Sequence, residues 1–171
     1  MSLRNILKGT GVAVVTPFAK NGAVDYDALG KLLDYIIGNN VEYIVTLGTT
    51  GETPVLTTKE KIDIIQATYA HVNSRVPVIV GIGGNNTHEV VEQLAILPLK
   101  DATAILSASP FYNKPSQEGI FQHYRAIAEK SPKPVILYNV PSRTGRNMEA
   151  ATTLRLATEV HNIAGIKEAS G

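Results

Sequence analysis

A lysine stands inside an apolar, strand-like run near the end of the chain, residues 163–169, which read IAGIKEA. Burial disfavours the charged form of an amine, and a neutral amine is a nucleophile that condenses with a ketone or aldehyde to a Schiff base. The resulting iminium acts as an electron sink, so a carbanion can form beside it. We therefore expect Lys167 to lie in a buried strand and to do Schiff-base chemistry. The alternative is a surface lysine at a strand end.

Carbanion chemistry also needs a proton shuttle, and a tyrosine phenol held by hydroxyl partners can supply one. Phenols, hydroxyls and a guanidinium follow the other strand-like runs, in GTTGE (48–52), SPFYN (109–113) and YNVPSR (138–143). The Gly-Thr-Thr-Gly segment offers backbone N–H groups and hydroxyls to a carboxylate, and Arg143 can hold a second carboxylate in bidentate fashion. The predicted substrate is therefore an anionic carbonyl compound.

Alternating strand and helix patterns would bring these residues to one rim. Short runs, near-continuously apolar as in parallel strands covered on both faces, occupy residues 11–18, 43–48, 77–83, 102–109, 134–140 and 163–169. Apolar residues at helical spacing occupy the intervening segments 25–40, 58–74, 87–101, 116–131 and 147–160. Each segment begins near a side chain that can cap a helix. The pattern predicts an α/β fold whose strands place their carboxyl ends, and hence the polar residues, together.

Two architectures fit this order of elements, an open doubly wound sheet and a (β/α)8 barrel. A dinucleotide-binding sheet should carry G-x-G-x-x-G after its first strand, and no such motif is present there. We therefore predict a (β/α)8 TIM barrel. Because only six strands are predicted, we expect residues 1–171 to be a single barrel domain that is incomplete, with its C-terminal part missing.

Composition excludes several other classes of protein. The chain has 171 residues, a net charge of +1 and 18% charged residues, so it lacks the basic surface expected of a nucleic-acid or anionic-membrane partner. It contains no cysteine, and its four histidines form no H-x-x-x-H pair, so we expect no metal site. No apolar run is long enough to span a membrane, and no secretory signal is evident. These features predict a cytoplasmic protein.

Four blocks of sequence resemble the signature blocks of the dihydrodipicolinate synthase family: GTTGE (48–52), SPFYNKP (109–115), YNVPSRTG (138–145) and GIKEASG (165–171). This family condenses pyruvate with aspartate semialdehyde in the diaminopimelate route to lysine. It belongs to the Schiff-base lyases that include N-acetylneuraminate lyase. The resemblance covers the whole chain, in order. It implies a barrel enzyme, a lyase, that needs no metal or organic cofactor.

The resemblance also implies a role for each matching residue. Lys167 matches the lysine that binds pyruvate, and Tyr138 matches the tyrosine that transfers protons above it. Thr49 and Tyr112 match the remaining members of the proton relay. In the family, the tyrosine that Tyr112 matches reaches into a neighbouring subunit, which implies a homo-oligomer, a dimer of dimers. Thr50 matches a residue that binds the carboxylate of pyruvate. Arg143 matches a residue that binds the carboxylate of aspartate semialdehyde.

The match to the family's lysine-feedback site is partial. Asn85 and Glu89 agree with it, whereas Thr58, Lys61 and Phe111 depart from the residues that lysine-sensitive members often carry. Two alternatives to the synthase stay open. One is a related Schiff-base aldolase that acts on another 2-keto acid, such as sialic acid or a keto-deoxy sugar acid. The other is a truncated chain that associates through exposed strand edges.

Overall fold

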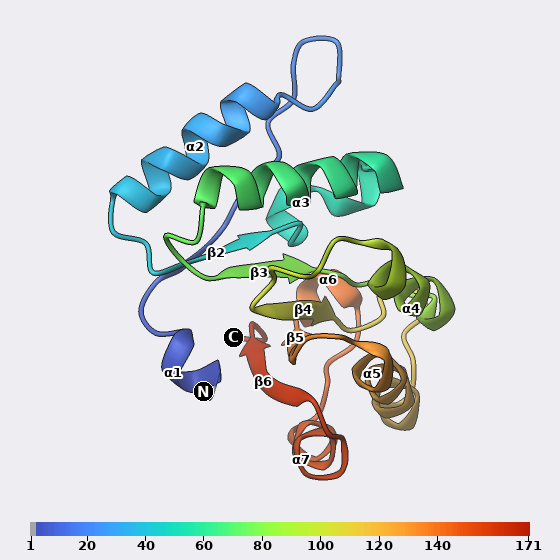
Figure 1. Cartoon of the computed structure of the whole chain (residues 1–171). Helices are drawn as coiled ribbons and strands as arrows, with labels where there is room; N and C mark the ends of the chain where they lie inside the picture. Colours follow the sequence, from blue (N-terminus) through green and yellow to red (C-terminus); the bar gives the residue numbers. More distant parts are fainter. Residues whose placement is uncertain (1–2) are drawn as a thin grey trace. The chain divides into compact units, whose positions relative to one another are not determined.

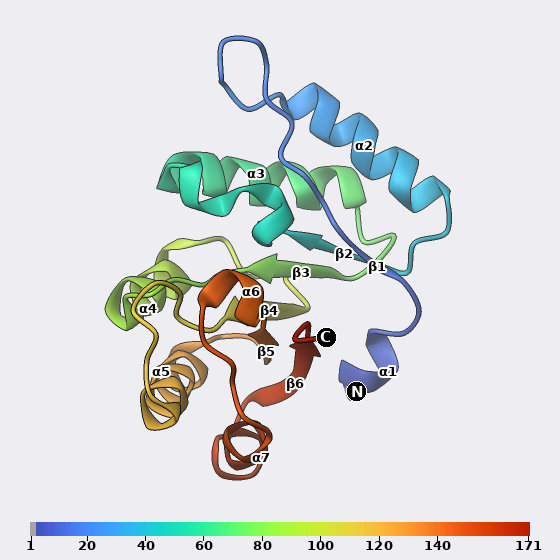
Figure 2. The same cartoon turned by 180° about the vertical axis from the view of Figure 1, so that it is seen from behind.

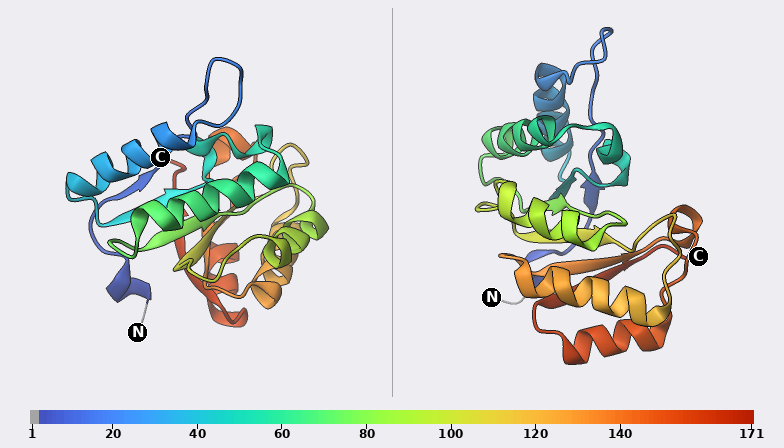
Figure 3. Two further views of the ribbon diagram at one scale, coloured as in Figure 1. Left: turned by 45° about the horizontal axis from the view of Figure 1, so that its top comes forward. Right: turned by 90° about the vertical axis from the view of Figure 1, so that its right-hand side faces the viewer.

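The computed structural model describes residues 3–171, and these residues form two compact units (Figures 1–3). The first unit contains residues 3–81 and 97–103, and the second contains residues 82–96 and 104–171. The six proposed site residues are divided between the units. Thr49 and Thr50 belong to the first, and the other four belong to the second.

The first unit is a parallel β/α layer. Its strands pair in the order β1 (Gly11–Ala13), β2 (Tyr43–Thr46) and β3 (Val78–Gly81). Helix α2 (Tyr26–Gly38) packs on α3 (Thr58–Val72), which itself contacts β2 and β3 (Figures 1 and 2). Three short helices complete the unit, namely α1 (Leu3–Ile6), η1 (Thr49–Gly51) and η2 (Thr53–Val55).

The second unit repeats this arrangement. Its parallel strands are β4 (Ala104–Ala108), β5 (Val135–Asn139) and β6 (Ile163–Glu168), with β5 in the middle. Its helices are α4 (Thr87–Ile96), α5 (Gln117–Lys130), α6 (Pro141–Thr144) and α7 (Ala150–Glu159). Helix α5 lies between α4 and α7 and contacts β5, while α7 contacts β6 (Figure 3).

Each unit buries the apolar runs that the sequence offers. Strand β3 is buried along its whole length, and β2, β4 and β5 are buried at all but one position each. The helices contribute one stripe each, because residues three or four apart share a helix face. Side chains with less than 2% exposure include Leu29, Leu33, Ile64 and Ile65 in the first unit and Ile105, Ile120, Ile127, Leu137 and Leu156 in the second.

Side-chain caps begin three of the helices near the predicted positions. Asp25 accepts from the Ala28 N–H at 2.9 Å at the start of α2, and Ser116 accepts from the Gly119 N–H at 3.1 Å at the start of α5. At α3 the cap is Thr57, one residue before the predicted segment, and it forms a reciprocal capping box with Glu60. Polar residues thus mark three of the strand-to-helix junctions.

The six strands and five long helices lie in the segments where the sequence predicted them, but several are shorter than predicted. Helix α4 ends at Ile96, five residues before its predicted segment ends. Strand β1 ends at Ala13, five residues early, and Val15 is already 47% exposed. The expectation that Lys167 lies in a buried strand is wrong, because Ala164–Glu168 are all exposed. Strand β6 is the last strand of its sheet and hydrogen-bonds only to β5, so its other edge remains open.

Candidate active site

The ends of β5 and β6 bring Lys167 and Tyr138 together. The two residues are partners in the register of these parallel strands, so their side chains share one face of the sheet. The Lys167 Nζ lies 4.4 Å from the centroid of the Tyr138 ring. Tyr138 as a residue is 8% exposed, whereas Lys167 is exposed. The structure therefore places an accessible amine over the ring of a buried tyrosine, the pair of residue types that Schiff-base chemistry with a neighbouring proton donor uses.

The next residue of each strand points to the opposite face, where a second pair forms. The Asn139 side-chain amide donates from Nδ2 to both carboxylate oxygens of Glu168, at 3.0 Å each. This hydrogen bond, followed by those of Ser170, lowers the pKa of the Glu168 carboxyl below its usual value. Neither residue was among the candidates chosen from sequence. The alternation of the strand offered a signal, because Asn139 follows Tyr138 directly within the YNVP block.

The buried Tyr124 phenol supports the ends of β4 and β5. The Tyr124 hydroxyl on α5 donates to the Ser107 carbonyl at 2.9 Å and lies 3.2 Å from the Ser109 Oγ. Burial raises the pKa of Tyr124, so it stays a neutral donor. The backbone N–H of Ser109 donates to the carbonyl of Tyr138 at 3.1 Å. Helix α5 thereby helps fix the end of β4, which in turn holds the backbone of Tyr138.

Tyr112 lies apart from the Lys167–Tyr138 pair in the described structure. It is 86% exposed, with no hydrogen bond or ring contact to either residue within positions 3–171. Its φ of 68° is rare for a bulky side chain, and such backbone strain persists only where surrounding contacts impose it. Those contacts include two hydrogen bonds at 3.1 Å between Asn113 and Asn85. The loop is thus braced while its tyrosine projects outward.

Arg143 follows β5 on the single helical turn α6. Pro141 begins this turn and Gly145, with a φ of 73°, ends it. Thr144 is buried and donates its hydroxyl to the Arg146 carbonyl at 2.9 Å, which anchors the turn. The Arg143 side chain is exposed and makes no ion pair with any residue that the structure describes. It is therefore available to an anionic ligand.

In the first unit, Thr49 and Thr50 lie directly after β2 on the 3₁₀ turn η1, and both are exposed. The turn is tied down by other threonines. The Thr16 hydroxyl donates to the Gly51 carbonyl at 2.7 Å, and the Thr53 hydroxyl donates to the Leu47 carbonyl at 2.7 Å. The sequence alone assigned no role to these two supporting threonines.

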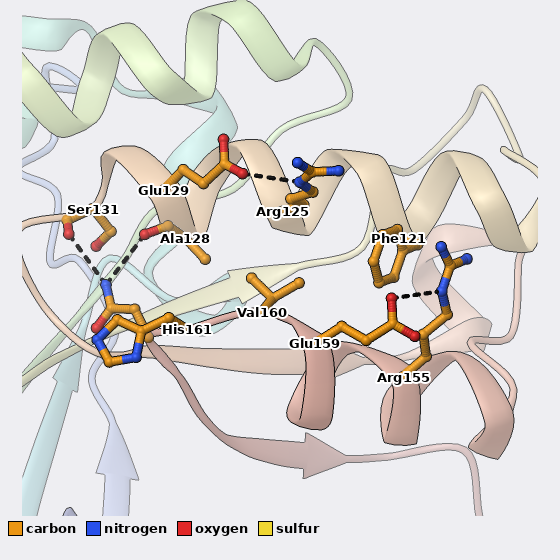
Figure 4. A pocket seen from close by; sticks show the side chains of 10 residues that line it. Phe121, Arg125, Ala128, Glu129, Ser131, Arg155, Glu159, Val160 and His161 are labelled. Carbon is orange, nitrogen blue, oxygen red and sulfur yellow. Dashed lines mark hydrogen bonds and ion pairs between the residues drawn. The ribbon is translucent and has the colours of Figure 1, made fainter.

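A separate groove of about 810 Å³ lies between the C-terminal parts of α5 and α7 (Figure 4). Its charged side chains pair with each other: Arg125 with Glu129 at 2.9 Å, and Arg155 with Glu159 at 3.2 Å. Its lining reaches residues just before β6, whereas Lys167 lies near the other end of that strand. The groove is therefore distinct from the Lys167–Tyr138 pair.

Residues 3–171 contain neither a cluster of metal ligands nor a membrane-spanning helix. No group of three or more His, Cys, Asp or Glu side chains there is placed to hold a metal ion. None of the helices in this part of the chain is long and apolar enough to cross a membrane.

Several curated proteins are similar to this chain over nearly its whole length. Among curated proteins, the 4-hydroxy-tetrahydrodipicolinate synthases of Parabacteroides distasonis and Bacillus subtilis are 55% and 46% identical to this chain. The alignments cover 96% and 93% of this chain, but only 56% and 55% of those proteins. The chain therefore spans little more than half the length of these relatives.

Solved structures give the same result. The 4-hydroxy-tetrahydrodipicolinate synthase of Methylacidiphilum fumariolicum is 41% identical with a TM-score of 0.92, and the pyruvate-complexed dihydrodipicolinate synthase of Acinetobacter baumannii is 45% identical with a TM-score of 0.91. The matches cover 96% and 95% of this chain and 55% of each solved chain. They confirm the predicted fold, the N-terminal part of a (β/α)8 barrel.

The model of the Dihydrodipicolinate synthetase family matches residues 6–171. Together with the relatives above, this match shows that the chain belongs to that family.

Proposed function

We propose that this chain carries the Schiff-base centre of a 4-hydroxy-tetrahydrodipicolinate synthase, which condenses pyruvate with L-aspartate 4-semialdehyde. One observation carries the proposal: the Lys167 amine lies 4.4 Å from the Tyr138 ring centroid, at partner positions of β5 and β6. Support also comes from the curated relatives, which bear this enzyme's name, and from the solved A. baumannii structure, which contains pyruvate.

The proposed reaction begins when the Lys167 amine, once it has lost a proton, attacks the ketone carbon of pyruvate. Loss of water gives the Schiff base, and Tyr138 transfers the protons that this step requires. Loss of a proton from the methyl carbon then gives an enamine, because the iminium accepts the electron pair. The enamine carbon attacks the aldehyde carbon of the second substrate. The amino group of that substrate finally displaces Lys167 by transimination, which closes the ring and frees the lysine.

The other site residues keep the roles that the resemblance implies. Thr49 and Tyr112 serve the proton relay, Thr50 binds the carboxylate of pyruvate, and Arg143 binds the carboxylate of aspartate semialdehyde. The exposure of all four side chains is compatible with ligand contact. No metal or organic cofactor enters this scheme, because the iminium itself stabilises the carbanion. We expect the enzyme to work in the cytoplasm, in diaminopimelate and lysine biosynthesis.

We further propose that two copies associate around Tyr112, within a dimer of dimers. An 86% exposed tyrosine on a braced loop suits insertion into another subunit. Association is not universal in the family, since one solved relative, at 39% identity, is described as a monomeric variant. Sedimentation velocity of the chain and of its Tyr112→Ala variant tests the proposal. A wild-type chain that stays monomeric at micromolar concentration would contradict it.

A comparison of acceptors tests the function itself. Pyruvate consumption is measured with aspartate semialdehyde and, separately, with N-acetylmannosamine, the acceptor expected of a sialic-acid aldolase. The proposed function predicts turnover with the semialdehyde, and loss of that turnover in Lys167→Arg, which keeps the positive charge but cannot form the Schiff base. Turnover with the sugar alone would assign the chain to the related aldolases instead.

A further inference from the structure

The pairing of β6 with β5 contains one irregularity. Val135 pairs with Ile163, but the next residue, Ile136, pairs with Gly165. Ala164 is therefore an extra residue on β6, which is the arrangement of a β-bulge. Bulges are rare between parallel strands and common beside active sites, where they change the direction of a side chain.

The bulge decides which side chain lies opposite Tyr138. If the pairing of Val135 with Ile163 continued without it, Tyr138 would face Ile166, and Lys167 would face Asn139. Because successive residues of a strand point to opposite faces, this shift would move the lysine to the other side of the sheet. The observed register instead pairs Tyr138 with Lys167 and Asn139 with Glu168.

The contact between Asn139 and Glu168 exists only in the bulged register. Asn139 is 1% exposed and donates to both oxygens of Glu168 at 3.0 Å. The backbone reinforces this register just beyond the strand, where the Ala169 N–H donates to the Asn139 carbonyl at 2.9 Å. In the regular register, Lys167 would take the place of the glutamate, and the buried amide of Asn139 would face another donor.

Hydrogen bonds to residues other than Glu168 also hold the Asn139 side chain, so its position does not depend on β6. Its Oδ1 accepts from the Met148 N–H at 3.0 Å, and its Nδ2 donates to the Asn147 Oδ1 at 2.8 Å. Gln117 on α5 in turn holds residues 147–149, since it donates to the Asn147 carbonyl at 2.9 Å and accepts from the Glu149 N–H at 3.1 Å. The amide therefore cannot follow β6 if the strand slips.

We propose that Asn139 and Glu168 are positioning residues whose contact selects the bulged register of β6 and so holds the Lys167 amine beside Tyr138. The effect on the register stands on the strand geometry alone. The effect on catalysis rests on the proposed function, in which Lys167 forms the Schiff base.

Disulfide trapping tests the register without any need for activity. The chain has no cysteine, so engineered pairs report unambiguously. Tyr138→Cys with Lys167→Cys tests the bulged register, and Tyr138→Cys with Ile166→Cys tests the regular one, because paired strands lie within reach of a disulfide. We expect the first pair to close faster. Adding Glu168→Ala should lower the ratio of the two rates roughly tenfold, whereas Glu168→Gln, which keeps an acceptor oxygen, should preserve it. A ratio that Glu168→Ala leaves unchanged overturns the proposal.

A second experiment measures the rate at which pyruvate is trapped on Lys167 by borohydride. Glu168→Ala and Asn139→Asp should each slow trapping roughly tenfold. Glu168→Gln, which keeps an acceptor oxygen for the Asn139 amide, should trap at close to the wild-type rate, which a general sensitivity of this position to substitution would not produce. Glu92→Ala, which removes an exposed carboxylate of α4, is the matched control and should trap as the wild type does.

The outcomes separate this inference from the proposed function. Trapping at the wild-type rate in both Glu168→Ala and Asn139→Asp overturns the positioning role. A wild-type chain that traps no pyruvate overturns the proposed function, while the disulfide ratios still decide the register.

Discussion

Replacing Tyr138 with phenylalanine would separate the contribution of its ring from that of its hydroxyl. The ring is the part that the Lys167 amine contacts, with 4.4 Å between the Nζ and the centroid. Phenylalanine keeps this contact, and a cation–π interaction at such an exposed amine contributes about 0.5–1 kcal/mol. The hydroxyl makes no hydrogen bond to any residue within 3–171, so its removal breaks none. We therefore expect the free energy of unfolding to change by less than about 1 kcal/mol.

The effect on chemistry should be much larger. A positioned general acid or base contributes about 10²–10⁴-fold to a proton-transfer step, which corresponds to about 3–5 kcal/mol of activation free energy. If Tyr138 transfers the protons of Schiff-base and enamine formation, its hydroxyl supplies this factor. The Tyr138→Phe variant should then be folded, should keep the amine in place, and should lose 10²–10⁴-fold in rate.

The exchange of the pyruvate methyl protons in D₂O, followed by NMR, measures enamine formation without the second substrate. Tyr35→Phe is the matched control, because Tyr35 lies on α2 and is 70% exposed. We expect the control to exchange at the wild-type rate. Exchange at the wild-type rate in Tyr138→Phe would refute the assignment of the proton transfer to this phenol.

Two further predictions concern stability. Asn162 has a φ of 78° and donates from Nδ2 to the carbonyls of Ala128, Ser131 and Lys133 at 3.0–3.3 Å. Asn162→Ala should therefore lower the free energy of unfolding, measured in urea, by about 2–4 kcal/mol. Asn162→Gly should lower it less, because glycine tolerates a positive φ, and equal losses in the two variants would contradict a role for the left-handed conformation. Burial lowers the pKa of His123 from 6.5 to about 4. As the pH falls, this imidazole therefore takes up a proton at a higher pH in the unfolded chain than in the folded chain. His123 should therefore reduce stability progressively between about pH 6.5 and 4, and His123→Gln should remove that part of the pH dependence of urea unfolding; an unchanged profile would show that His123 does not titrate differently in the folded chain.

The sequence predicted the positions of the elements well, in part because three helix starts are encoded locally. Asp25, Thr57 and Ser116 sit where helices begin and cap them through their own side chains. The near-continuous apolar runs favoured parallel strands with both faces covered, as β2, β3, β4 and β5 are in the main. That Tyr138 and Lys167 lie at the ends of neighbouring strands could also be predicted, because parallel strands bring their carboxyl ends to one rim.

What the sequence did not reveal depends on contacts between distant segments. The bulge at Ala164 leaves no mark in an apolar run, yet it determines which of two adjacent residues meets Tyr138. The contact of Asn139 with Glu168 spans 29 positions and could be recognised only once the register was known. The burial of β6 was predicted wrongly, because composition shows that a strand is apolar but not whether its outer edge is paired.

The central claim is that Lys167 forms a Schiff base with pyruvate, and borohydride trapping followed by peptide mapping tests it most directly. The protein is incubated with pyruvate, reduced and weighed intact, and the modified peptide is then sequenced by mass spectrometry. We predict a single reduced pyruvate adduct on Lys167, and none in Lys167→Arg. A folded chain that gains no adduct, or gains it on another lysine, would contradict the account.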